Sequence, residues 1–327
     1  MSAAVEFPEA PVDERGVLLE TPEMRAFGLA ALRRMMSAQP PAPAGAGAGA
    51  GAPPPPAPPP WPREDDAFLL AFLRARKYKV DKAFAVLCKF SAFWHSAETR
   101  AILDGQSAEK LRAFYVGGPT KLLQGRDAEG NGLSTLNAGK MNAAFVNYDA
   151  QVHMSMLGLA WLLENEDVQL RGLTIVETFQ HFSLGAAMGL RGALSGAQQK
   201  KLTEIFLDSM PMRIRHIYVI HQPWYFSMIW AVAKLFFKKK ITERVELFGA
   251  HTDKLFERVP AAALPLEFGG TLDEPADAAI SRFVAVEKAG GTLGGFVLPF
   301  CIDAPAGGGA GGGARGGGAG DTAAPAV

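Results

Sequence analysis

Glu177 directly follows a short apolar run, residues 173–176, that begins after Gly172. Such a run is typical of a strand covered on both faces. A carboxylate at the end of a buried strand loses its hydration, so it needs a partner or its pKa rises. On residue type alone, Glu177 is therefore either a satisfied ion pair or helix cap, or a carboxyl with a raised pKa.

A second distinctive stretch, residues 222–244, reads QPWYFSMIWAVAKLFFKKKITER. From 225 to 237 nearly every residue is large and apolar, which predicts a helix that is apolar on all sides. It is about half the roughly twenty residues needed to cross a bilayer. Three lysines and Arg244 follow it. The stretch is either a cover over an apolar cavity that meets an anionic membrane, or a buried helix with cations at its negative end.

Patterns of catalysis and metal binding are missing from the sequence. There is no G-x-S-x-G motif, and the six histidines have no metal-ligand spacing with a nearby acid. Gly139 and Lys140 resemble the end of a phosphate-binding loop, but Ser134 replaces its first glycine and Met141 its magnesium ligand. We expect no enzyme activity, metal or cofactor, although a Ser-His-Asp set assembled by the fold stays open.

Composition sets the remaining bounds. The 327 residues allow about two domains, and Lys+Arg and Asp+Glu both number 33, so no net charge favours nucleic acid. The two cysteines, Cys88 and Cys301, are far apart and fit a reducing compartment. No basic region leads into an apolar run at the N-terminus, so we expect no secretory signal and a cytoplasmic protein.

The elements that position these residues follow from local pattern. Thr-Pro-Glu at 21–23 predicts the start of a short helix in an N-terminal tail, residues 1–38. Residues 39–60 are almost entirely Pro, Ala and Gly and predict a linker. Apolar residues at helical spacing predict a helical subdomain over 61–115. The cations at 74–77 end its first helix, and we expect them to be solvated.

The next segment predicts an α/β sheet. A helix is expected from Asp149 to about Glu166, and apolar runs at 173–176 and 214–220 predict two strands covered on both faces. A further helical pattern lies near residues 276–288.

Five phrases in order carry a family resemblance: FLRARKYKVDKAF, WLLENEDVQLRGLTIVETFQHFSL, IFLDSMPMRIRHIYVIHQPWYF, KKKITERVELFG and LPLEFGGTL. With them, roughly residues 61–272 resemble the CRAL-TRIO lipid-binding family, in the branch of cellular retinaldehyde-binding protein, the clavesins and alpha-tocopherol transfer protein. The resemblance implies an N-terminal helical bundle and, over 116–272, a mixed β-sheet lipid-binding domain with a gate helix. Residues 273–327 would be a C-terminal extension with a Gly-rich tail.

The resemblance also implies a ligand site. Glu177 matches a carboxylate in the cavity of the retinaldehyde binder, and Lys201 matches a basic residue of that site. Ser155 stands where that protein has a tyrosine, so an aromatic wall is missing. The gate helix contributes Phe226, Ile229, Trp230 and Ala233.

Basic positions that bind a phosphoinositide headgroup in the tocopherol branch match Arg76, Arg213, Lys240 and Arg244. Arg215 is their neighbour. Arginine suits this role because its planar fork makes two bonds to one phosphate.

Two departures from the family pattern affect the fold. Residues 131–135, Asn-Gly-Leu-Ser-Thr, replace an Arg followed by apolar β-formers, so we expect a short or irregular strand. The gate has Lys234-Leu235-Phe236 in place of Lys-Pro-Phe, so we expect its usual kink to be missing.

The resemblance implies a non-enzymatic carrier of one hydrophobic ligand, such as a retinoid, a tocopherol-like molecule or another lipid. It would exchange this ligand at membranes containing phosphatidylinositol bisphosphate, as a peripheral protein of endosomal or other intracellular membranes. A phosphoinositide-binding adaptor of endosomal or trans-Golgi trafficking is the alternative, with the Pro-rich arm as a site for protein partners. Regulation of a small GTPase is a further alternative, but the sequence has no catalytic arginine motif to support it.

Overall fold

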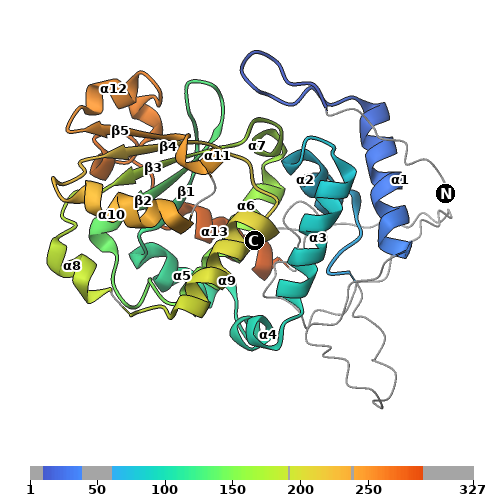
Figure 1. Cartoon of the computed structure of the whole chain (residues 1–327), viewed down its shortest axis with the longest axis horizontal. Helices are drawn as coiled ribbons and strands as arrows, with labels where there is room; N and C mark the ends of the chain where they lie inside the picture. Colours follow the sequence, from blue (N-terminus) through green and yellow to red (C-terminus); the bar gives the residue numbers. More distant parts are fainter. Residues whose placement is uncertain (1–9, 39–60, 191, 237–238, 290–327) are drawn as a thin grey trace, which may run out of the picture.

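The computed structural model describes residues 10–38, 61–190, 192–236 and 239–289. The linker expected over 39–60 and the Gly-rich tail lie outside the described residues. Helices α1 to α5 come before the sheet, and α1, α2 and α3 pack together beyond one end of its strands (Figure 1). Their bounds are α1 (Pro22–Ala38), α2 (Asp66–Ala75), α3 (Val80–Trp94), α4 (Ala97–Leu103) and α5 (Ala108–Gly117). The start predicted for α1 is confirmed, because the Thr21 hydroxyl accepts a hydrogen bond from the Met24 N–H at 3.3 Å.

Five strands form one mixed sheet in the order β1-β2-β3-β4-β5. The strands are β1 (Thr120–Arg126), β2 (Gly132–Asn137), β3 (Leu173–Thr178), β4 (Ile214–Ile220) and β5 (Val245–Gly249). β1 and β2 are antiparallel, and the other three pairs are parallel. The expected α/β class is confirmed.

Strand β2 is regular over its whole length, so the expectation of a short or irregular strand at 131–135 is wrong. All its residues from Gly132 to Asn137 pair in register with β3. The irregularity lies in β1, between Leu122 and Arg126. Pairing on both sides therefore outweighs the weak strand propensity of Asn, Gly and Ser.

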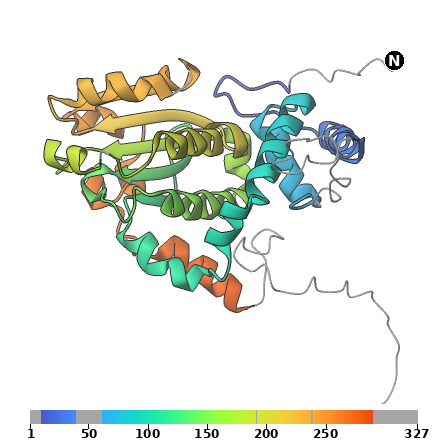
Figure 2. The same ribbon diagram turned by 60° about the horizontal axis from the view of Figure 1, so that its bottom comes forward.

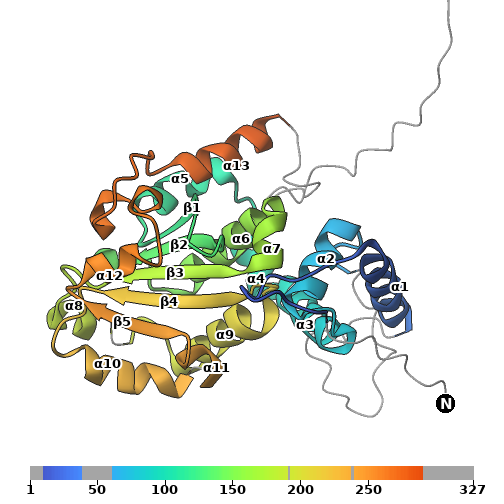
Figure 3. The same cartoon turned by 90° about the horizontal axis from the view of Figure 1, so that it is seen from above.

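Further helices connect the parallel strands or follow β5, and they cover both faces of the sheet, as Figure 3 shows from above. They are α6 (Tyr148–Glu164), α7 (Glu166–Arg171), α8 (Leu184–Gly189), α9 (Gly196–Glu204), a π-helical turn (Ile205–Ser209), α10 (Phe226–Ala233), α11 (Lys239–Thr242), α12 (Thr252–Phe256) and α13 (Ala278–Lys288). Val176 packs with Leu255 of α12 on one face. Ile175 packs on the other face, with Phe226 of α10.

The apolar segment expected at 225–237 forms α10 and then a 3-10 turn, Lys234–Phe236. The regular α-helix therefore ends at Ala233, although no proline is present.

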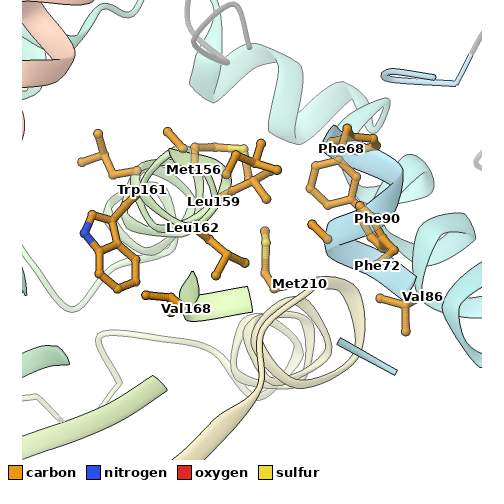
Figure 4. Packing of buried hydrophobic residues seen from close by; sticks show 14 of the residues in the cluster. Phe68, Phe72, Val86, Phe90, Met156, Leu159, Trp161, Leu162, Val168 and Met210 are labelled. Atoms are coloured by element: carbon orange, nitrogen blue, oxygen red, sulfur yellow. The ribbon is translucent and has the colours of Figure 1, made fainter. Parts of the chain in front are cut away.

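The main core joins the N-terminal helices to α6. In Figure 4, Met156 and Leu159 of α6 lie opposite Phe68 and Phe90, with Met210 between the elements. Helix α13 packs beside α5 (Figure 2), and its Phe283 is fully buried. The domain boundaries stay predictions.

Candidate functional site

Glu177 lies on the face of β3 that α10 covers. Its neighbours in register are apolar, Leu136 on β2 and Val219 on β4. No hydrogen bond or ion pair joins its carboxyl to any residue that the structure describes, and burial raises the pKa of Glu177 to about 7. Because the side chain keeps some accessible area, this carboxyl can donate a hydrogen bond when protonated to a molecule beside it.

Apolar side chains around Glu177 are incompletely packed. Ile217, Val219 and Phe226 form the buried centre of the cluster between β4 and α10. Other apolar members of this cluster are only partly buried: Ile175, Phe179, Ile214, Trp230, Ile241 and Val245. A tightly filled core would bury such residues. The cluster therefore offers apolar surface to a hydrophobic guest next to one titratable carboxyl.

Of the four gate residues expected from the sequence, the structure describes the side chains of two, Phe226 and Trp230. Phe226 is buried, with its ring 4.8 Å from Phe179 and 6.3 Å from Trp230 between centroids. The side chains of Ile229 and Ala233 lie outside the described residues.

Large apolar side chains are exposed on α10 and beside its two ends. Trp224 is 85% exposed, Leu235 81% and Met228 58%. Nearby α8 exposes Met188 and Leu184. Large exposed apolar side chains on one segment mark a surface for binding protein or lipid.

Ser155 and Lys201 have partners other than Glu177. The Ser155 hydroxyl is buried and donates to the Gln151 carbonyl of its own helix at 2.8 Å. Lys201 is half-exposed on α9 and pairs with Glu98, and this hydrogen bond raises the pKa of Lys201. Their role in ligand binding stays a prediction.

A cationic groove of about 660 Å³ lies between α2–α3 and the β4–α11 region. All five basic residues singled out from the sequence line this groove: Arg76, Arg213, Arg215, Lys240 and Arg244. Among its described lining residues, Asp208 is the single acid. The groove therefore concentrates positive charge in a protein whose total charge is balanced.

The sequence reasoning missed the opposite wall, which consists of lysines from the start of α3 onward. Lys79, Lys82 and Lys89 line the groove, together with Lys77. The three are spaced by three and seven residues, which places them on one side of a helix. That spacing is the sequence signal by which these three lysines could have been identified.

Among the described residues, no carboxylate lies within ion-pair distance of Arg213 or Arg244, whereas the Arg215 guanidinium lies 3.9 Å from the Glu129 carboxylate. Arg213 donates to the Leu170 carbonyl at 2.8 Å, and Arg244 donates to the Ile214 carbonyl. Burial, with the nearby charges of Arg215 and Arg244, lowers the pKa of Arg213 to about 10. Burial and Arg215 also lower the pKa of Arg244. Like charges held together in this way favour an anion in the groove.

Arg74 was expected to be solvated, and this is wrong. Its side chain is 2% exposed and donates to Glu20 at 2.7 and 2.8 Å and to Gln169 at 2.8 Å. Burial opposes ionisation of Glu20, but hydrogen bonds from Arg74 and Tyr78 lower the pKa of Glu20. Arg74 therefore anchors the N-terminal segment and is not among the groove residues.

The groove and the apolar cluster are contiguous. Ile214 and Ile241 line the groove and also pack against the cluster of Val219 and Phe226. An occupant of either place therefore contacts residues that border the other.

The fold and these residues agree with family models. The model described as CRAL/TRIO domain matches residues 120–270, and that described as CRAL/TRIO, N-terminal domain matches 60–89. The chain belongs to the CRAL-TRIO family of lipid-binding proteins.

Two curated relatives are similar over much of this CRAL-TRIO chain. Human alpha-tocopherol transfer protein-like is 27% identical over 292 residues, which cover 89% of this chain and 77% of that protein. Clavesin-1 of Xenopus laevis is 30% identical over 216 residues, 64% of this chain and 62% of that protein. The crystal structure of Sfh5 superposes with a TM-score of 0.45 at 14% identity, over 64% of this chain and 74% of that one.

Within the described ranges, none of the helices combines the length and the apolar character that a bilayer span requires. The same ranges contain no group of three or more His, Cys, Asp or Glu side chains that could hold a metal.

Proposed function

We propose that this CRAL-TRIO protein is a non-enzymatic carrier that holds one hydrophobic ligand between its sheet and α10 and exchanges it at phosphoinositide-containing membranes. The observation that supports the membrane part is that Arg76, Arg213, Lys240 and Arg244, together with their neighbour Arg215, line one groove. Each cation near an anionic leaflet contributes about 1 kcal/mol. Several together recruit the protein reversibly.

The ligand part rests on Glu177 and the apolar cluster beside α10. A carboxyl with a pKa of about 7 is partly protonated at neutral pH. It then donates a hydrogen bond to a hydroxyl or carbonyl end, while the apolar side chains take the rest of the molecule. Retinoids, tocopherol-like molecules and other single lipids have this form, and one relative is named for tocopherol transfer.

The gate connects the two parts. Its exposed Trp224, Met228 and Leu235 are suited to enter the interface of a bilayer. Docking would bring these side chains into lipid while the groove binds headgroups. The ligand would then leave or enter through the displaced gate.

The test is transfer of fluorescent retinoid, tocopherol and phosphatidylinositol analogues between phosphatidylcholine vesicles with or without phosphatidylinositol bisphosphate. Replacing Arg213 and Arg244 together by alanine should weaken vesicle binding by about thirtyfold, since two cations are lost. Lys254→Ala, an exposed cation on α12, is the matched control. No stable uptake of any analogue would refute the carrier.

A phosphoinositide-binding adaptor is the second candidate, because the cationic groove accounts for membrane binding without any cargo. Its distinguishing result is strong binding to vesicles with phosphatidylinositol bisphosphate and no lipid recovered with the purified protein. Native mass spectrometry of protein from its own cells shows whether lipid is recovered with it.

A further inference from the structure

Residues 10–20, here called the strap, extend from the α2–α3 connection to the beginning of β4 and then turn back toward α1 (Figure 3, dark blue). The Ala10 N–H donates to the Lys77 carbonyl at 3.0 Å, and the Leu18 N–H donates to the Leu170 carbonyl at 3.0 Å. Ala10 and Leu18 are buried. The strap is therefore tied to Lys77, which lines the cationic groove, and to Leu170 of α7.

A tight turn shapes the middle of the strap. The Gly16 N–H donates to the Asp13 carbonyl at 2.8 Å, and the Asp13 carboxyl accepts from the Val17 N–H at 2.7 Å. Gly16 has φ of +71°, which disfavours any residue with a Cβ. The turn presents the carbonyls of residues 15 and 16 to the groove arginines.

Those two carbonyls hold two arginines. Arg213 donates to the Gly16 carbonyl at 3.1 Å, and Arg215 donates to the Arg15 carbonyl at 3.0 Å. Arg213 and Arg215 line the groove, whereas the described strap residues are not among its lining residues. The strap thus contacts these two arginines without itself lining the groove.

Arg215 is seated between two glycines. A Cβ on Gly16 would lie 2.7 Å from Arg215 Cζ. A Cβ on Gly172, where φ is +115°, would lie 3.0 Å from Arg215 Cδ. Glycine at 16 leaves room for the Arg215 guanidinium, and glycine at 172 leaves room for the aliphatic part of the same side chain.

We infer that the strap is a positioning device for the anion site, in which Gly16 and its neighbouring carbonyl orient Arg213 and Arg215 toward a bound phosphate. A long side chain loses rotamer freedom when it binds, so holding it beforehand strengthens binding. This inference rests on the proposed phosphate-binding function of the groove. The strap lies outside both segments that the family models match, 60–89 and 120–270.

The test compares Gly16→Ala with Gly105→Ala. Gly105 also has a positive φ, of +65°, but a Cβ there meets nothing within 4 Å. It therefore reproduces the backbone strain without touching an arginine. Two measurements are made on the full chain: the NMR signal of the Arg215 Nε–H, and affinity for phosphatidylcholine vesicles containing phosphatidylinositol bisphosphate. Phosphatidylserine vesicles of equal charge test binding to an anionic lipid surface alone. Soluble inositol trisphosphate tests binding to the phosphate groups alone.

Gly16→Ala should shift the Arg215 signal and weaken binding to the bisphosphate vesicles about fivefold, the contribution of one cation near a leaflet. Gly105→Ala should do neither. In an Arg215→Ala background, Gly16→Ala should cause no further loss, because the nearest atoms to the added Cβ all belong to Arg215, while the residue 16 carbonyl that binds Arg213 is retained.

An unmoved Arg215 signal, a loss shared with Gly105→Ala, or an additive loss in the double variant would each overturn the positioning role. If the unchanged protein binds neither bisphosphate vesicles nor inositol trisphosphate, the proposed groove function fails, and this inference fails with it. A shifted Arg215 signal beside unchanged affinity would overturn the inference and leave the groove function standing.

Discussion

Replacing Glu177 by glutamine should stabilise the ligand-free protein above neutral pH and have little effect in acid. Burial raises the pKa of this carboxyl from 4.5 to about 7. Each tenfold change in proton affinity corresponds to about 1.4 kcal/mol, so the ionised form destabilises the fold by roughly 3 kcal/mol. The native state binds the proton more tightly than the unfolded chain, so stability falls as pH rises. The loss begins near pH 4.5 and is almost complete just above pH 7.

Urea unfolding followed by tryptophan fluorescence, on delipidated protein at several pH values, measures this difference. Glu177→Gln should gain about 3 kcal/mol over the unchanged protein at pH 8 and nearly nothing at pH 4. Glu257→Gln, at an exposed glutamate, is the control for loss of a charge. If the difference in free energy of unfolding between Glu177→Gln and the unchanged protein does not vary with pH, the pKa of Glu177 is not raised.

Three further variants test the groove, the strap and the gate. Asp208→Asn should raise affinity for bisphosphate vesicles about fivefold, since it removes the single acid among the described groove residues. Glu20→Ala should lower the free energy of unfolding by about 3 kcal/mol, because it leaves Arg74 buried without its main partner. Trp224→Ala should weaken vesicle binding about tenfold, since a large apolar side chain no longer enters the bilayer.

Each of these variants has an outcome that contradicts its reasoning. Unchanged vesicle affinity for Asp208→Asn would mean that the anion binds away from this carboxylate. A Glu20→Ala protein as stable as the unchanged one, in urea at pH 7, would mean that Arg74 finds solvent or another partner. Leu266 is exposed on another surface. If Leu266→Ala weakens vesicle binding as much as Trp224→Ala does, the gate has no specific role in membrane binding.

Elements specified by neighbouring residues were predictable from the sequence. The strand at 214–220 was expected at the bounds that the structure has, because a continuous apolar run between polar residues is a local signal. The start of α1 was recognised from Thr21 and Pro22 for the same reason. The family resemblance pointed to four cations, with Arg215 as their neighbour, and all five line one groove; their role in phosphoinositide binding stays a prediction.

Features that depend on distant contacts were not predictable. Arg74 looked like a solvated helix end, but its partner Glu20 is 54 positions away in the chain. The carbonyl of Arg15 reaches Arg215 across 200 positions. No local pattern encodes such pairs, because burial of a charge is decided only when separate elements pack. The same holds for the Lys201–Glu98 pair.

A shared border between the cluster and the groove makes coupling of their occupants testable. Ile241 of α11 lines the groove and packs against the apolar cluster under α10. If headgroup binding shifts α11, cargo affinity should change by at least about fivefold, and cargo should change headgroup affinity by the same factor. Ile241→Ala should reduce this factor, whereas Leu266→Ala should not. Cargo dissociation constants that are equal with and without a short-chain phosphatidylinositol bisphosphate would show that the two places bind independently, and that docking does not drive release.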